Sequence, residues 1–450
     1  MDRKNLLKSL FALALPVILQ RMITAALNMV DTMMIGQMGE TRIAAVGLAN
    51  QFFFIFHLLM FGVNSGITIF TAQYFGKKDL GGVRRSAGLA VAVSFLSSMV
   101  FSLLAIAFPH WIMRIFSEDP MVIKEGVRYL RIIGLSYGLT GVSHGISFSL
   151  RAVGEPKVTL YISSAALVVN TVLNYGLILG NFGLPALGVQ GAAIATLIAR
   201  ALECGLMIAY LARTKHMLLD LKENFNFPKE FIKSVTKTSS LVVINEFLWS
   251  IGMSAVVVAY ASVGTDAAAA VQVANTIQNL FIVAGYGMAN AAAVLLGQSL
   301  GCGDFKLAIA QSRAFMLSGF SFGAILGILL HIFKGPILQV YRIQADTQQS
   351  IMQLLLIMSV FMGFKILNTT ISIGVLRSGG DTKFAFFVDT GSVWLAGVPM
   401  AFLAAKGLHL SIPMVYLFAS SMDVFRFVTG VPRALSNKWV RNLVMEEKIA

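Results

Sequence analysis

About twelve long apolar segments constrain the fold of this chain more than any other feature. Each is near 20 residues or longer, which is enough to cross a bilayer core of roughly 30 Å at about 1.5 Å per helical residue. Lipid offers no partner to unpaired backbone and the alternating pattern of a barrel is absent, so the segments are predicted to be helices. The expected spans are roughly 10–36, 44–75, 87–109, 128–150, 158–180, 187–211, 238–262, 268–299, 311–333, 351–376, 384–405 and 410–431.

Composition agrees with an all-α integral membrane protein. Hydrophobic residues make up 57% of the chain, charged residues 12%, and the mean hydropathy is +0.77. The net charge of +14 does not require a nucleic-acid partner, because about 23 of the 35 Lys and Arg residues fall in alternate loops and about 8 in the opposite loops. This positive-inside bias predicts a multi-pass protein of the inner (plasma) membrane with both termini in the cytoplasm.

The second half of the chain repeats the first. The stretch "AAVGLANQFFFIFHLLMFGVNSGITIFTAQYFGKKD" aligns without a gap with "AAVQVANTIQNLFIVAGYGMANAAAVLLGQSLGCGD", and "LRAVGEPK" at Leu150 returns as "LRSGGDTK" at Leu376. The sequence therefore predicts two pseudo-symmetric six-helix bundles, residues 1–220 and 235–450, joined by a cytoplasmic linker at 221–234. Parallel repeats of this kind are typical of transporters in which one bundle rocks against the other.

One carboxylate, Asp31, lies within the first apolar segment. Placing it in hydrocarbon costs about 2.5 to 3.5 kcal/mol on insertion scales, which marks it as a functional candidate unless it reaches water at the helix end. Asn170 and Asn174 share a helix face at four-residue spacing, and Thr196 is expected at a similar depth. This oxygen-rich set suits a proton or a hard cation, with Asp31 as the ligand if the ion is sodium. Alternatively, the amides only hold helices together.

A second group of charged residues falls in the C-terminal spans. Glu246 has no basic residue near it in its own segment, Asp389 lies in "FFVDTGSVW", and Lys365 lies in "GFKILNTT". We expect the three to form a buried cluster in which the lysine balances one acid, acting as a substrate or proton site. The alternative is a structural ion pair that fixes helix packing.

The order and spacing of several motifs resemble the multidrug and toxic compound extrusion (MATE) family over essentially the whole length. The motifs are "ALPVILQRM", "VDTMMIGQMG", "TAQYFGKKD", "LRAVGEPK", "LGVQGAAIATLIA" and "LRSGGDTK". The resemblance is closest to the bacterial NorM-like and DinF-like branches. It implies a secondary antiporter that exports organic, often cationic, drugs or metabolites in exchange for sodium ions or protons.

The same resemblance assigns Asp31 and the polar residues of the fifth span to the coupling-ion site of the N-terminal half. The glutamate at position 246 resembles one of the NorM-like branch. That branch also carries an acid in the tenth span, where this sequence has Lys365 and Asn368. The C-terminal group therefore departs from the pattern of that branch.

Three other classes of protein compete with this interpretation. A lipid-linked sugar flippase of the same superfamily would be expected to have more helices and a strongly basic central groove. A channel or receptor would differ by failing to transport against a gradient. An enzyme is disfavoured because the sequence has no phosphate-binding loop, paired metal-ligand motif or nucleophile elbow. We therefore expect no cofactor, a small organic substrate, a surrounding bilayer and a functional monomer.

Overall fold

The computed structural model describes residues 3–338 and 345–445, and these residues form helices and no strand. The long elements of the first half are α1 (Arg3–Gly36), α2 (Glu40–Gly76), α3 (Leu80–Ala107), α5 (Pro120–Ala152), α6 (Pro156–Leu179) and α7 (Val189–Arg213), with short α4 (Pro109–Phe116) and α8 (Leu221–Asn224). The second half contains α9 (Lys229–Ala261), α10 (Thr265–Gly301), α11 (Phe305–Leu338), α12 (Ala345–Thr369), α13 (Thr382–Phe386), α14 (Val398–Phe402), α15 (Ile412–Ala419) and α16 (Ser421–Leu435).

Four π-helical segments interrupt the second half. They are η1 (Thr370–Leu376), η2 (Phe387–Gly391), η3 (Val393–Gly397) and η4 (Leu403–Gly407). The first continues α12 without a break, and the others alternate with α13 and α14 along a single span, 382–407. Because each π turn inserts an extra residue, it changes which side chains face the interior, and such turns are frequent at functional sites.

Eleven helices among the described residues are long and apolar enough to cross a membrane. We count α5 as a twelfth because it has 33 residues and packs along α3 and α7, although charges near its start lower its hydropathy. The predicted all-α membrane bundle is confirmed. Helix ends differ by several residues: α9 begins at Lys229 rather than near 238, so part of the predicted linker is helical.

The chain forms two compact units. Unit 1 contains Met1–Ile18, Ala72–Lys78 and Thr236–Ala450, and unit 2 contains Leu19–Thr71 and Asp79–Val235. The dividing points at residues 18 and 71 fall inside α1 and α2. The superposition of residues 1–220 on 235–450 as two equivalent bundles remains a prediction.

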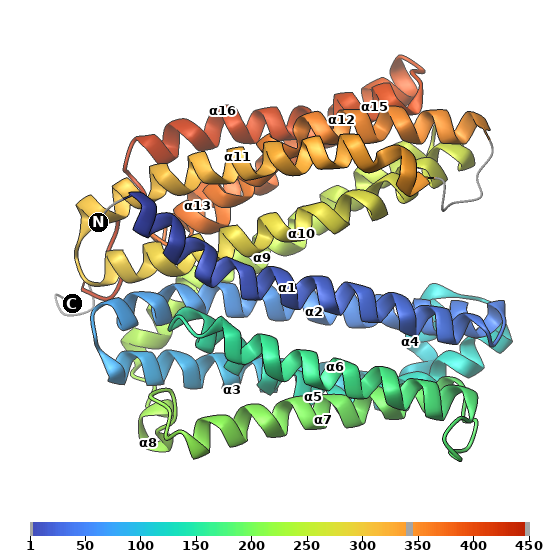
Figure 1. The fold of residues 1–450 in the computed structure, drawn as a ribbon, viewed down its shortest axis with the longest axis horizontal. Coiled ribbons are helices and arrows are strands. Elements are labelled where there is room, and N and C mark those ends of the chain that lie inside the picture. The colour runs from blue at the N-terminus through green and yellow to red at the C-terminus, as the bar shows by residue number, and fades with distance from the viewer. Residues whose placement is uncertain (1–2, 339–344, 446–450) are drawn as a thin grey trace. The chain divides into compact units, whose positions relative to one another are not determined.

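Unit 2 is organised around α5, which packs against both α3 and α7 (Figure 1). Small residues make the α3–α5 contact close: a Cβ added to Gly145 would lie 2.7 Å from the Cα of Val91, and one added to Gly141 would lie 2.6 Å from the carbonyl oxygen of Ser94. In lipid the hydrophobic effect does not bring helices together, so close packing of this kind stabilises the contact between α3 and α5 instead. It fixes α5 in the middle of the unit, beside the polar residues described below.

In unit 1, Gly76 and Gly301 occupy equivalent positions of the sequence repeat, and each packs against the backbone of the other copy. A Cβ added to Gly76 would lie 1.9 Å from the carbonyl oxygen of Gln298, and one added to Gly301 would lie 1.9 Å from the carbonyl oxygen of Gln73. Because Gln73 and Gln298 are also equivalent in the sequence repeat, the contact is reciprocal. It brings the end of α2 directly against the end of α10.

Candidate ion and substrate sites

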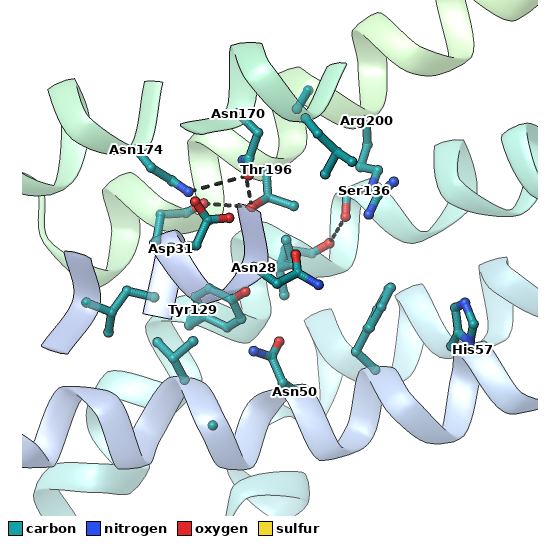
Figure 2. A pocket seen from close by; sticks show the side chains of 18 of the residues that line it. Asn28, Asp31, Asn50, His57, Tyr129, Ser136, Asn170, Asn174, Thr196 and Arg200 are labelled. Atoms are coloured by element: carbon teal, nitrogen blue, oxygen red, sulfur yellow. Dashed lines mark hydrogen bonds between the residues drawn. The ribbon is translucent and has the colours of Figure 1, made fainter. Parts of the chain in front are cut away.

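Unit 2 encloses a cavity of about 420 Å³ between α1, α2, α5, α6 and α7 (Figure 2). This volume is in the range of small-molecule sites. Its polar lining residues are Asn28, Asp31, Asn50, His57, Ser136, Tyr129, Asn170, Asn174, Thr196, Arg200 and Glu203. All four residues of the predicted coupling-ion site therefore line one cavity.

Asp31, Asn170 and Thr196 point toward one another from α1, α6 and α7 (Figure 2). The Asn170 amide is assigned from its partners, since nitrogen and oxygen are distinguished only by the hydrogen bonds they make. With Nδ2 toward Asp31, it donates to Asp31 Oδ2 at 3.0 Å, and its oxygen accepts from Thr196 Oγ1 at 3.3 Å and from Thr196 N at 3.2 Å. We adopt this orientation because it satisfies both amide atoms.

In the opposite orientation, drawn in Figure 2, Asn174 donates through Nδ2 to Asn170 Oδ1 at 3.4 Å and Asn170 donates to Thr196 Oγ1 at 3.3 Å. That orientation leaves Asp31 without the 3.0 Å bond. In this orientation Thr196 Oγ1 donates to the carbonyl of Ala192 at 3.0 Å, which fixes its position on α7; in the adopted orientation its single proton is shared between Ala192 and Asn170. The predicted proximity of these four residues is observed, and their role as an ion site remains to be tested.

Oxygen atoms in this region are buried without a partner. Asp31 Oδ1, Asn174 Oδ1 and Thr171 Oγ1 make no hydrogen bond of good geometry within the described part of the chain, although the Asn174 and Thr171 side chains lie close enough to the Asp31 carboxylate to stabilise its charge. The ion pairs found among those residues include none to Asp31. A buried carboxylate oxygen with no donor is costly unless a proton or a cation satisfies it.

The second acid of the cavity is neutralised locally. Arg200 lies 2.7 Å from Glu203 at the i, i+3 positions of α7, and Ser163 of α6 donates to the other carboxylate oxygen at 2.6 Å. Among the described residues that line the cavity, Asp31 is therefore the carboxylate without a paired cation.

Unit 1 holds the predicted C-terminal acids, and an arginine connects them. Arg377 Nη2 lies 2.7 Å from Glu246 Oε1 and 3.2 Å from Asp389 Oδ2. The side chains of Arg377, Glu246 and Asp389 are only 4%, 13% and 11% exposed. Asp389 also accepts from the Ser372 hydroxyl and, at 3.3 Å, from Asn245 Nδ2.

Lys365 does not join this cluster. Its Nζ donates to the Tyr416 hydroxyl at 3.0 Å and to Gln278 Oε1 at 3.4 Å, and it lies 4.0 Å from Asp423 Oδ2. The expected grouping of Lys365 with Glu246 and Asp389 is wrong, because Arg377 is the base that contacts both acids. Arg377 directly follows the predicted span 351–376, and η1 does end at Leu376, but the Arg377 guanidinium is buried in the interior rather than exposed in a loop.

Asp423 and Arg426 were also missed. Both lie in the last predicted span; Asp423 is 2% exposed, and Arg426 Nε lies 3.9 Å from Asp389 Oδ1. The signal was available in the sequence, because ionisable residues inside a membrane span normally face a partner in the bundle. Unit 1 therefore pairs its interior acids with interior bases.

A multi-pass helical bundle with an unpaired carboxylate facing a ligand-sized cavity has the organisation of a secondary transporter. The MatE family model matches residues 16–176 and 239–403, which together exceed half of the chain. The chain belongs to the MatE family. The two matches fall on the two copies of the sequence repeat.

Individual relatives cover almost the whole chain. A probable multidrug resistance protein NorM of Thermotoga maritima is 24% identical over 442 residues, covering 97% of this chain and 94% of the relative. One of Neisseria meningitidis is 26% identical, covering 90% and 88%. A crystal structure of a Vibrio cholerae MATE transporter matches with a TM-score of 0.88 at 16% identity, covering 97% and 99%, which supports the fold.

Proposed function

We propose that this protein is a multidrug antiporter that exports small organic compounds, often cationic, in exchange for sodium ions or protons. The relatives named as multidrug resistance proteins support the substrate class. The observation that carries the mechanism is the buried, unpartnered Oδ1 of Asp31 at the wall of the unit 2 cavity. A proton or a sodium ion would satisfy this oxygen, and the neighbouring amide and hydroxyl oxygens suit either.

Antiport requires that the coupling ion and the substrate each change the affinity of the protein for the other. If the coupling ion and the substrate each lower the affinity for the other, linkage requires the factor to be the same in both directions. Asp31 meets this requirement because its charge is not cancelled by a fixed cation, so the field in the cavity changes when the ion binds. An organic cation in the cavity would favour the empty, negative carboxylate, and loading of the ion would release it.

The carboxylates of unit 1 have a different proposed role. Glu246 and Asp389 share Arg377, so their charge is already balanced and offers little attraction to a cationic substrate. We assign them to helix packing rather than to binding, which is the structural alternative for this cluster. Lys365 has the same role with Asp423 and Tyr416.

The proposed setting is the cytoplasmic membrane with both termini inside, supported by the distribution of Lys and Arg among the loops. The proposed functional unit is a monomer.

Efflux of ethidium from proteoliposomes, with sodium and proton gradients imposed separately, tests the proposal. Uphill ethidium movement driven by one gradient and abolished by its collapse would support antiport and identify the ion. Ethidium movement only down its own gradient would indicate a channel. Failure of both gradients to drive ethidium or a panel of other organic cations, with translocation of a lipid-linked sugar instead, would favour the flippase and overturn the proposal.

A further inference from the structure

A groove of about 780 Å³ lies at the corner where α4 meets α5 in unit 2. Its lining contains five residues that are or can be cationic and one carboxylate. These are His110 and Arg114 of α4, Lys124, Arg128 and Arg131 of α5, and Glu118 between the helices. All six side chains belong to exposed residues, so the charges face outward rather than into the bundle.

Helical spacing places these charges on facing surfaces. Lys124, Arg128 and Arg131 are at i, i+4 and i+7 on α5, and His110 and Arg114 are at i and i+4 on α4. Arg128 lies 3.0 Å from Glu125. In the described part of the chain, Arg114, Lys124 and Arg131 have no carboxylate at ion-pair distance. The groove therefore carries unbalanced positive charge.

The other face of α4 is apolar and exposed. Ile112 and Met113 pack in the core of unit 2, while Trp111 is 67% exposed, Ile115 is 61% exposed and Phe108, just before the helix, is 58% exposed. A short helix between two long membrane helices, with an exposed tryptophan on one face and basic residues on another, is typical of an element at the membrane interface.

The length of α5 puts the basic residues at the same level. Its 33 residues span about 50 Å, whereas the hydrocarbon core is roughly 30 Å thick. The helix must extend beyond the core by about 20 Å in total. Lys124 lies about 6 Å from the start of α5, at headgroup level, and Arg128 and Arg131 lie about 12 and 17 Å from it, from where their long side chains can extend back toward the headgroups beside α4.

Positive-inside topology does not account for this cluster. The basic residues Lys77, Lys78, Arg84 and Arg85 lie at the start of α3, and the groove follows the other end of that helix. Since α3 has 28 residues and spans about 42 Å, its ends are on opposite sides of the membrane. The groove therefore concentrates positive charge on the side where the topology rule predicts few basic residues.

We propose that this groove binds the phosphate headgroup of an anionic phospholipid, with the acyl chains lying along Trp111 and Ile115. Guanidinium groups bind phosphate oxygens through two parallel hydrogen bonds, and Arg114 and Arg131 approach from different helices. A soluble phosphate ester shares the headgroup chemistry but has no use for the exposed apolar face. The apolar face therefore favours the lipid as the occupant.

Native mass spectrometry of the full-length protein, titrated with phosphatidylglycerol or phosphatidylcholine, tests the proposal. The variant Arg114→Gln, Lys124→Gln, Arg131→Gln should lose phosphatidylglycerol affinity on the order of 100-fold, at about one kcal/mol for each basic residue near an anionic surface. Its matched control is Lys229→Gln, Lys233→Gln, Lys237→Gln, which removes the same charge from three exposed lysines at four-residue intervals of α9 and should lower the affinity by a clearly smaller factor if the groove, and not total charge, binds the lipid.

A second pair of measurements separates the lipid from a soluble phosphate. Trp111→Ser should weaken phosphatidylglycerol binding with the charges intact, and excess glycerol 3-phosphate should not displace the lipid. Equal loss of phosphatidylglycerol affinity in the groove and control variants would show that the total charge of the protein, and not the groove, determines binding, and would overturn the proposal. Displacement of phosphatidylglycerol by glycerol 3-phosphate, or unchanged lipid binding by Trp111→Ser, would also overturn it. Thermal unfolding of each variant checks that the fold is kept.

Discussion

Units 1 and 2 both bury carboxylates, but they compensate them in different ways. In unit 2, Asp31 meets the Asn170 amide and lies near Thr196, and one of its oxygens has no partner within the described residues. In unit 1, Asp389 meets Arg377 at 3.2 Å and Arg426 at 3.9 Å. Neutral partners leave the charge of the carboxylate uncompensated, so that a bound ion can change it, whereas the arginines already balance it. The same residue type is therefore suited to ion exchange in one unit and to packing in the other.

The arginines of the repeated motif show the same divergence. Arg151 of "LRAVGEPK" has its guanidinium 4.2 Å from the centre of the Phe148 ring. Its repeat equivalent, Arg377 of "LRSGGDTK", joins Glu246 and Asp389. Equivalent positions in the sequence thus support a cation–π contact in one copy and a charge network in the other.

The largest expected effect comes from breaking the network of unit 1. Arg377→Met leaves the buried Glu246 without a cation and Asp389 with only the more distant Arg426, and it should lower the free energy of unfolding by about 3 to 5 kcal/mol. Heat-induced unfolding of the purified protein in detergent measures this. The triple variant Arg377→Met, Glu246→Gln, Asp389→Asn should recover much of the stability, because it removes both acids together with Arg377 and leaves only Arg426 without its carboxylate 3.9 Å away. A single variant as stable as the parent would contradict the fixed-charge interpretation.

Removing the charge of unit 2 should affect transport instead of stability. Asp31→Asn keeps the size of the side chain and an oxygen that accepts from Asn170, so its unfolding temperature should match the parent. Gradient-driven ethidium efflux should fall more than about tenfold, since the coupling ion loses its charged ligand. Asp389→Asn is the counterpart and should mainly lower stability. Full efflux by Asp31→Asn at normal expression would return this acid to a structural role.

A smaller effect is expected from the neutral partners of Asp31. Thr196→Val removes the hydroxyl that bonds Asn170 and Ala192 but keeps the shape of the side chain. Losing about 1 kcal/mol of hydrogen bonding should raise the ion concentration for half-maximal efflux by roughly fivefold. The ion dependence of efflux measures this, and Ser254→Ala on α9 provides a control hydroxyl that bonds only its own helix. An unchanged half-maximal concentration would remove Thr196 from the site.

The smallest effect should come from an exposed ion pair. Arg85 lies 3.4 Å from Glu223, and their side chains are 31% and 37% exposed. Arg85→Gln should change the free energy of unfolding by less than about 1 kcal/mol, and added salt should reduce the difference further. The Arg377→Met effect should persist in salt because its partners are buried. Equal salt dependence of the two variants would show that the unit 1 network is not shielded from solvent.

The length of each apolar segment was sufficient to predict the membrane helices, because every helix that crosses a bilayer needs about the same minimum number of apolar residues. The grouping of Asp31 with Asn170, Asn174 and Thr196 was also predictable. Four-residue spacing and the count of residues from each helix end determine face and depth when the helices are regular α-helices. Which ion loads the site depends on ligand geometry that no single sequence encodes.

The network of unit 1 was not predictable by the same reasoning. Ser372 and Asp389 lie in π-helical turns, and Arg377 directly follows one. Each extra residue in such a turn rotates the following side chains around the helix by roughly 100°, so a count at regular spacing assigns the wrong faces. The position of Arg377 before "SGGDTK" also favoured a loop, whereas its side chain is almost fully buried.

Gly76 and Gly301 each pack against the backbone of the other copy of the repeat, and this restricts which residues the two copies can carry at these positions. A methyl group on either glycine would strike the backbone of the other copy at 1.9 Å. Because the obstructing atoms are backbone carbonyls, no change of side chain in the opposite copy can make room. Each position therefore requires glycine for as long as the other copy crosses it, and a shift in the backbone of either copy is transmitted directly to the other.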